Sequence, residues 1–170
     1  TILEVEAEHG PDTDDRAVNT CYLPGELRLE YTSGGFPVSQ RLIYLRDDLA
    51  MIGIKTQAEA KLSFRSKASE KDGIYLECHP VPSSPGEYRA LIGLGKPVGD
   101  TTGIEALAKA HDARWEGYLN RTLRNDMPPE YNRIAVKSII TLISNWKAPK
   151  GDLLHAGVIP SQGASYFMGF

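Results

Sequence analysis

The first half of the chain is a series of short segments with the pattern of β-strands, separated by turn signals. The clearest is residues 26–31, where Leu27, Leu29 and Tyr31 alternate with polar residues and share one face. Similar segments are residues 2–6, 38–45, 49–55, 60–65, 73–79 and 88–94, with turn residues at 33–35, 46–48, 70–73 and 80–86. Because no helical pattern intervenes, the series favours an antiparallel β-sandwich over a parallel βαβ sheet.

The pattern changes at Gly99. Thr102 and Glu105 predict a capping box, and a long amphipathic helix follows. The residues at helical spacing are Ile104, Leu107, Ala108, His111, Trp115, Tyr118, Leu119 and Thr122. Pro128 and Pro129 interrupt the pattern where a first helical turn tolerates proline. A second helix is predicted to end before Pro149, with a stripe of Ile134, Ala135, Ser138, Ile139, Leu142, Ile143 and Trp146.

The last stretch, residues 145–170, predicts an irregular loop. It is rich in glycine and proline, which break helices and strand ladders, yet it carries Trp146, Tyr166, Phe167 and Phe170. Large rings in such a loop either fill a core or form a platform for a ligand. The cluster stops abruptly, and we expect the protein to continue after Phe170. The predicted organisation is a β-sandwich domain at 1–99, a helical linker at 100–147 and an aromatic and glycine-rich loop at 148–170.

Composition and charge exclude several classes of protein. A hydrophobic share of 41% and a charged share of 24% are ordinary for a soluble globular protein, and no segment predicts a transmembrane span. The net charge of -3 and the pI near 5.8 lack the basic surface that nucleic acids or anionic membranes attract. We therefore expect neither nucleic acid nor a membrane as a partner.

The two cysteines, Cys21 and Cys78, lie far apart without a CxxC spacing, so zinc and thioredoxin-type chemistry have no support. They could pair across facing strands in an oxidising compartment, or both could be free thiols. The compartment stays open, with a periplasmic or secreted location favoured over a cytoplasmic one.

Other motifs favour ordinary structural roles. Residues 93–99 resemble a glycine-rich phosphate loop, but an antiparallel series precedes them and Asp100 occupies the start of the helix, so we interpret them as a plain connection. The acidic residues 12–15 lack the glycine and the closing glutamate of a calcium loop. The four histidines are scattered: His9, His79, His111 and His155. No metal site and no cofactor are therefore predicted.

Glycosidic chemistry would need two carboxylates on opposite sides of a sugar. The carboxylates on or beside the predicted helices are Glu105, Asp112, Glu116, Asp126 and Glu130. Nothing singles out a pair, and a charged solvent face explains them. The aromatic loop is different, because planar apolar faces are what a pyranose ring stacks against, although core packing also explains it.

A series of motifs in the C-terminal third resembles a known family. They are Arg114-Trp115-x-x-Tyr118-Leu119, Ala135-Val136-Lys137, Asn145-Trp146-Lys147-Ala148-Pro149-x-Gly151, Pro160-Ser161 and Tyr166-Phe167-x-Gly169. The series is similar to the segment that enters the catalytic barrel of bacterial glycoside hydrolase family 63 proteins, α-glucosidases related to processing mannosyl-oligosaccharide glucosidase. In that family a Trp-x-Trp-Asp-x-Trp motif would come next.

The resemblance implies an N-terminal β-sandwich, a helical linker and an (α/α)6 barrel that holds the general acid and general base of an inverting mechanism. No catalytic residue then falls within residues 1–170, and the missing barrel and an oligosaccharide substrate would be the partners. The positions that match the approach to the substrate-binding loop are Tyr166, Phe167, Gly169 and Phe170. The rival hypothesis is a non-catalytic β-sandwich that binds carbohydrate or a protein partner.

Overall fold

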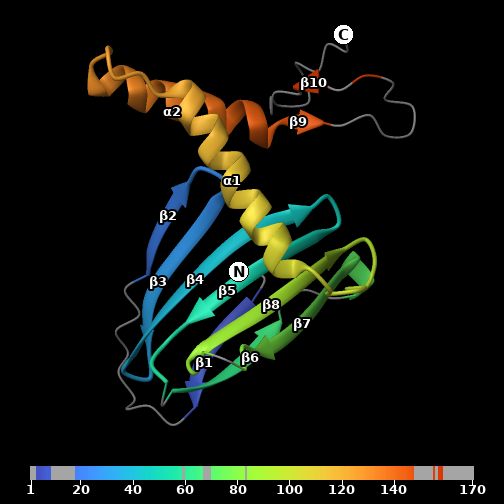
Figure 1. The fold of residues 1–170 in the computed structure, drawn as a ribbon. Coiled ribbons are helices and arrows are strands. Elements are labelled where there is room, and N and C mark those ends of the chain that lie inside the picture. The colour runs from blue at the N-terminus through green and yellow to red at the C-terminus, as the bar shows by residue number, and fades with distance from the viewer. Residues whose placement is uncertain are drawn as a thin grey trace, which may run out of the picture. The chain divides into compact units, whose positions relative to one another are not determined.

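The N-terminal part of the computed structural model is built on a six-stranded antiparallel sheet (Figure 1). The structure describes residues 3–8, 18–58, 60–66, 70–82, 84–147, 155 and 157–158. The strands of the sheet are β2 (Asn19–Leu23), β3 (Glu26–Ser33), β4 (Phe36–Arg46), β5 (Leu49–Lys55), β7 (Ile74–Pro80) and β8 (Glu87–Leu94). Their order is β2-β3-β4-β5-β8-β7. The predicted mainly β, antiparallel architecture with helices after it is confirmed.

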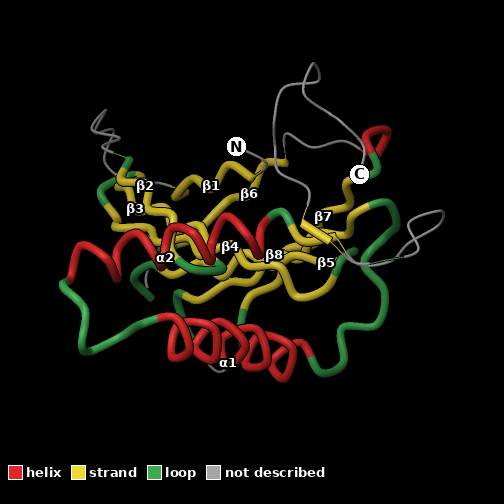
Figure 2. The backbone as a smooth tube through the Cα atoms, turned by 90° about the horizontal axis from the view of Figure 1, so that it is seen from above, coloured by secondary structure: helices red, strands yellow, loops and turns green. Residues whose placement is uncertain are grey.

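A second, two-stranded sheet covers one face of the six-stranded sheet. It pairs β1 (Leu3–Glu8) with β6 (Lys61–Ser66) in antiparallel fashion. Val5 and Leu62 from this pair join a buried core whose other members are Val38, Ala50, Ile52, Ile54, Ala90 and Ile92. Figure 2 shows β1 and β6 on one side of the large sheet and the start of α1 (Ile104–Thr122) on the other.

The opposite face is covered by the start of α1 (Ile104–Thr122). Ile104 and Ala108 join a second core whose sheet members are Ile43, Leu45, Leu49, Met51 and Leu91. Because successive residues of a strand point to opposite faces, β5 contributes Ile52 to the first core and Met51 to the second. A strand buried on both faces explains why residues 49–52 are uniformly apolar.

The turns follow the glycine signals of the sequence. Gly34 and Gly35 have φ values of 55° and 81° and join Ser33 to its partner Phe36. A two-residue hairpin loop with both φ values positive matches the right-handed twist of the strands, and glycine adopts it without steric cost. Residues 70–72 form a short 3-10 helix, η1 (Glu70–Asp72), before Gly73.

The chain divides into two compact units, Thr1–Ala113 and Arg114–Phe170, and the boundary falls inside α1. The domain limits predicted at residues 99 and 147 stay predictions. The second unit holds α2 (Pro129–Ser144), which has Pro128 as its N-cap and Pro129 in its first turn, as predicted. Neither helix has the length and apolar character needed to cross a bilayer, within the part of the chain described.

One strand was not predicted, and two local predictions were wrong. β2 was missed, because four of its five residues are exposed and an edge strand without a buried face shows no apolar alternation. The capping box does not form: α1 begins at Ile104, and the carboxylate of Glu105 accepts a hydrogen bond from Arg89 instead. Trp146 lies outside α2, in β9 (Trp146–Lys147), which pairs with β10 (Gly157–Val158).

Candidate functional site

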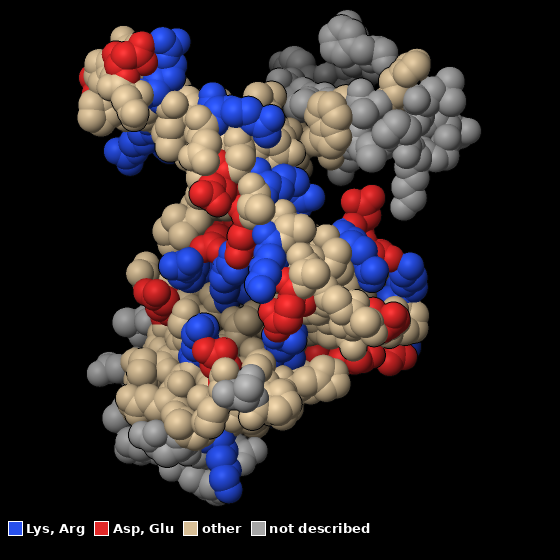
Figure 3. All heavy atoms as spheres, in the orientation of Figure 1, with Lys and Arg blue, Asp and Glu red and all other residues tan. Residues whose placement is uncertain are grey.

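One register row of the six-stranded sheet is rich in basic side chains on the face covered by α1. From β2 to β7 the row reads Cys21, Arg28, Arg41, Gly53, Arg89 and His79, each paired with the next. Arg41 lies two residues before Ile43, and Arg89 lies two residues before Leu91, so both share a face with the core under α1. Figure 3 shows basic and acidic side chains gathered on this face beside the helix.

Two carboxylates of α1 bind arginines of this row. Arg89 donates to Glu105, and Arg41 donates to Asp112, with 2.5 Å between Nη2 and Oδ1. The two carboxylates are seven residues apart, which is about 10.5 Å along a helix. The two arginines stand on strands separated by β5, about 9.6 Å apart. Because the two spacings match, both ion pairs form and hold the first turns of α1 across the strands.

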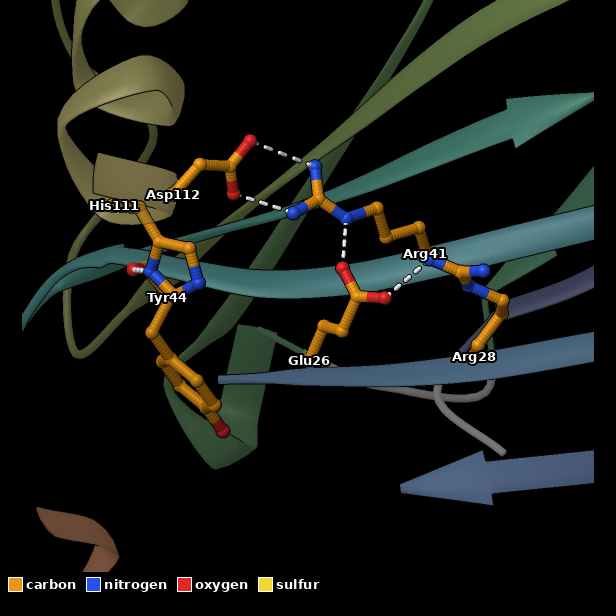
Figure 4. A network of polar contacts seen from close by, with 6 residues as sticks. All are labelled: Glu26, Arg28, Arg41, Tyr44, His111 and Asp112. Carbon is orange, nitrogen blue, oxygen red and sulfur yellow. Dashed lines mark hydrogen bonds and ion pairs between the residues drawn. The ribbon is translucent and has the colours of Figure 1, made fainter. Parts of the chain in front are cut away.

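Glu26 lies between Arg28 and Arg41 in this network (Figure 4). Its side chain is only 9% exposed and accepts hydrogen bonds from both Arg28 and Arg41. Burial disfavours the charge on Arg41, but the hydrogen bonds to Asp112 and Glu26 outweigh it and raise the pKa of Arg41 above its ordinary value. The arginine therefore links a buried carboxylate of β3 to an exposed carboxylate of α1.

His111, one residue before Asp112, anchors α1 to the sheet. It is 4% exposed, and its Nδ1 lies 3.0 Å from the backbone oxygen of Tyr44. Because a carbonyl oxygen only accepts, the Nδ1 atom carries the proton and donates. His111, predicted on the apolar stripe of the helix, is therefore a packed histidine with a structural partner.

A groove of about 400 Å³ opens beside the first turn of α1, within the first unit. Leu91 and Ile104 contribute apolar surface, and the segment Pro80-Val81-Pro82 forms a wall at the end of β7. Four polar residues complete the lining: His79, Arg89, Thr101 and Glu105. The groove therefore combines apolar surface with polar groups that can orient a small ligand.

The charges around the groove are paired. Arg89 binds Glu105, and His79 Nε2 lies 3.5 Å from Glu77 Oε2 on the same strand. Asp100 accepts a hydrogen bond of 2.8 Å from the backbone N–H of Thr102, and this contact with Thr102 lowers the pKa of Asp100 below its usual value. An acidic side chain therefore already occupies the approach to the start of α1.

The sequence-predicted substrate-binding residues, Tyr166, Phe167, Gly169 and Phe170, lie outside the described residues, as does the acidic stretch 12–15. The structure therefore neither brings them together nor separates them. Among the carboxylates weighed for acid and base work, Glu105 and Asp112 bind arginines, and Asp126 binds Arg124 with 2.6 Å between Oδ2 and Nη2.

The two cysteines are free thiols on opposite edge strands of the sheet. Cys21 stands on β2 and Cys78 on β7, with four strands between them, so they cannot form a disulfide within this sheet. Burial raises the pKa of the Cys78 thiol. Of the two alternatives left open by the sequence, the structure supports free thiols.

The basic row and the groove were not predicted from the sequence. Hairpin turns at residues 34–35 fix the register of β3 against β4, so the pairing of Arg28 with Arg41 could have been found from the turn. The approach of Arg89 to this row depends on the non-sequential pairing of β5 with β8, which no local signal contains.

No protein-family model matches the chain. Within the described ranges, no group of three or more His, Cys, Asp or Glu side chains could hold a metal ion. Nor does any buried side-chain nitrogen or oxygen described there lack a hydrogen-bond partner. What the described site offers is a groove with paired polar groups and apolar walls.

Proposed function

We propose that residues 1–170 are the non-catalytic N-terminal part of an inverting glycoside hydrolase similar to family 63, which cleaves α-glucosidic bonds in oligosaccharides. The observation that carries this proposal is the motif series from Arg114 to Gly169, which resembles the segment that enters the catalytic barrel of that family. In this proposal the two sheets form a β-sandwich, the helices form a linker, and an (α/α)6 barrel after Phe170 supplies the general acid and general base.

The surface of α2 supports a large apolar partner. Its apolar residues extend over about 240° of the helix circumference at 3.6 residues per turn. They are Ile134, Ala135, Val136, Ile139, Ile140, Leu142 and Ile143. No residue of α2 is buried, and Ile134 is 62% exposed. A helix whose apolar residues extend over so wide an arc is normally packed on more than one side, and a helical barrel would cover it.

The aromatic loop would then contribute to the substrate site. In the intact enzyme we expect Tyr166, Phe167 and Phe170, with Gly169 between them, to shape the end of the sugar-binding site. Aromatic rings bury large apolar faces, and the flat face of a pyranose is complementary to them. The acid and base would come from the barrel, so residues 1–170 alone would have no hydrolytic activity.

The test compares residues 1–170 with the full product of the gene that encodes them, on a panel of α-linked glucose disaccharides. We expect the longer protein to release glucose, and NMR of the fresh product to show the β-anomer, because a single displacement inverts the configuration. We expect residues 1–170 to release none.

Hydrolysis by residues 1–170 alone would overturn the proposal, because it would place the acid and base within this chain. A natural protein that ends at Phe170 would overturn it too, and would favour the rival hypothesis of a binding module. Release of the α-anomer by the longer protein would contradict inversion while leaving the glycosidase assignment intact.

A further inference from the structure

The groove beside the first turn of α1 has the chemistry of a site for a neutral ligand. Its permanent cation, Arg89, is paired with Glu105, and the imidazole of His79 lies beside Glu77. Asp100 adds a further negative charge before α1. A phosphate or sulfate would meet no uncompensated positive charge, and the described carboxylates form no cluster for a cation.

The size of the groove suits a small ligand. Its volume of about 400 Å³ lies within the range of ligand sites. Liquid water occupies about 30 Å³ per molecule, so the groove would exchange roughly a dozen waters for its ligand. One or two hexose rings fill such a space, whereas a longer chain would extend beyond it.

The polar lining provides donors and acceptors next to each other. The guanidinium of Arg89 has five N–H donors, and its hydrogen bond to Glu105 uses one nitrogen. The second carboxylate oxygen of Glu105 and the hydroxyl of Thr101 add acceptors on the same rim. Neighbouring sugar hydroxyls both donate and accept, so they can bind an arginine and a carboxylate together. The apolar wall of Pro80, Val81 and Pro82 would face the C–H groups of the ring.

Other neutral ligands fit less well. The residues of β7 and β8 that line the groove pair with each other in the sheet, so an extended peptide could find backbone partners only along the outer edge of β7. The lining has no Phe, Tyr or Trp, and only the small imidazole of His79 offers a nucleobase an aromatic ring to stack on. We propose that this groove is a non-catalytic binding site for a neutral mono- or disaccharide unit, recognised by Arg89, Glu105, His79 and Thr101. The proposal stands on the groove alone, independent of the catalytic assignment.

The test is an NMR titration of uniformly ¹⁵N-labelled residues 1–170 with maltose. We expect saturable shifts at the amides of His79, Arg89, Thr101 and Glu105, with a dissociation constant of about 1 mM, as for a small site with few charged contacts. Glu105→Gln should weaken binding at least about tenfold, because it removes a charged acceptor. Asp112→Asn is the matched control: it also removes an arginine partner on α1, but Asp112 lines no part of the groove.

Thr101→Ala is a second variant: it changes an exposed residue of the groove lining and leaves the ion pairs intact. Absence of shifts at millimolar maltose, or equal loss of binding in Glu105→Gln and Asp112→Asn, would overturn the proposal. Shifts at the same amides with inorganic phosphate, but not with maltose, would show an anion site and would also overturn it. The titration uses residues 1–170, without a barrel. A negative result would therefore leave the glycosidase proposal standing, and a negative hydrolysis test would leave the groove proposal standing.

Discussion

Gly86 lies just before β8 and Gly53 lies inside the central strand β5, and the two positions differ in whether they require glycine. Gly86 has φ of 79°, and a Cβ at this position would lie 2.5 Å from the backbone oxygen of Thr56. Gly53 lies in the extended ladder of β5, and a Cβ there would meet no atom within 4 Å. Only the first position requires glycine sterically.

Gly86→Ala should therefore be strongly destabilising. The left-handed conformation costs an alanine about 1–2 kcal/mol, and the approach to Thr56 adds a clash with rigid backbone. We expect a loss of more than about 2 kcal/mol in the free energy of unfolding, measured by urea denaturation. Gly95→Ala is the control, since Gly95 has φ of 77° but open space at its Cβ, and it should lose only about 1 kcal/mol. Equal losses at the two sites would contradict the steric argument.

Gly53→Ala should have the opposite sign. Glycine in the middle of a strand is destabilising by about 0.5–1 kcal/mol relative to alanine, because it loses more backbone freedom on folding. With no atom near the new methyl group, urea denaturation should show a gain of that size. A loss of stability would show that the space between Arg41 and Arg89 on this row is needed for the fold itself.

The two free thiols should differ in reactivity. Cys21 is exposed on the edge strand β2, whereas Cys78 is partly buried and packs against the first core, and burial raises its pKa. Because the thiolate is the reactive form, iodoacetamide at neutral pH should modify Cys21 first and Cys78 slowly. Peptide mapping by mass spectrometry over time would measure both rates. Faster alkylation of Cys78 would contradict its burial.

At the scale of the elements, Arg41 links α1 to the sheet through two carboxylates of very different burial. Glu26 of β3 is 9% exposed at its side chain, while Asp112 of α1 is 51% exposed, and both bind Arg41. Removing a buried hydrogen-bonded charge leaves its partners poorly compensated, whereas an exposed ion pair contributes little.

Glu26→Gln should therefore lower the free energy of unfolding by about 2 kcal/mol, and Asp112→Asn by less than about 1 kcal/mol. Both losses can be measured by urea denaturation, with added salt reducing only the smaller one. A larger loss for Asp112→Asn would mean that the helix contact, rather than the buried carboxylate, controls the stability of this network.

The sequence predicted the elements well where their apolar pattern is strong and poorly where it is absent. The predicted strand at 49–55 coincides with β5, and the predicted residues Ile104, Ala108, His111 and Trp115 are all buried in α1. β2 has no buried side chain, so periodicity could not reveal it. The end of α2 was extended to Trp146 because that ring continues the apolar stripe, although the chain pairs as β9 there.

The site was less predictable than the elements. The sequence placed the functional residues in the segment 166–170, which lies outside the described residues. The groove instead joins residues of β7, β8 and the start of α1, and Thr101 lies 22 positions after His79. Such a site depends on strand order, and the pairing of β5 with β8 has no signature in local sequence.

At the scale of the whole molecule, the apolar surface of α2 should make residues 1–170 self-associate. Ile134 is 62% exposed and Leu142 is 48% exposed. Exposing apolar surface to water costs about 25 cal/mol of free energy per Å². We expect analytical ultracentrifugation to show association that rises with concentration. Ile134→Glu with Leu142→Glu should abolish it, while Lys137→Glu on the polar side of α2 should not.

In a protein that continues into a barrel, α2 would be covered and the association should disappear. A chain of 1–170 that stays monomeric at all concentrations would contradict the need for an apolar partner and would remove the structural support for the proposed barrel.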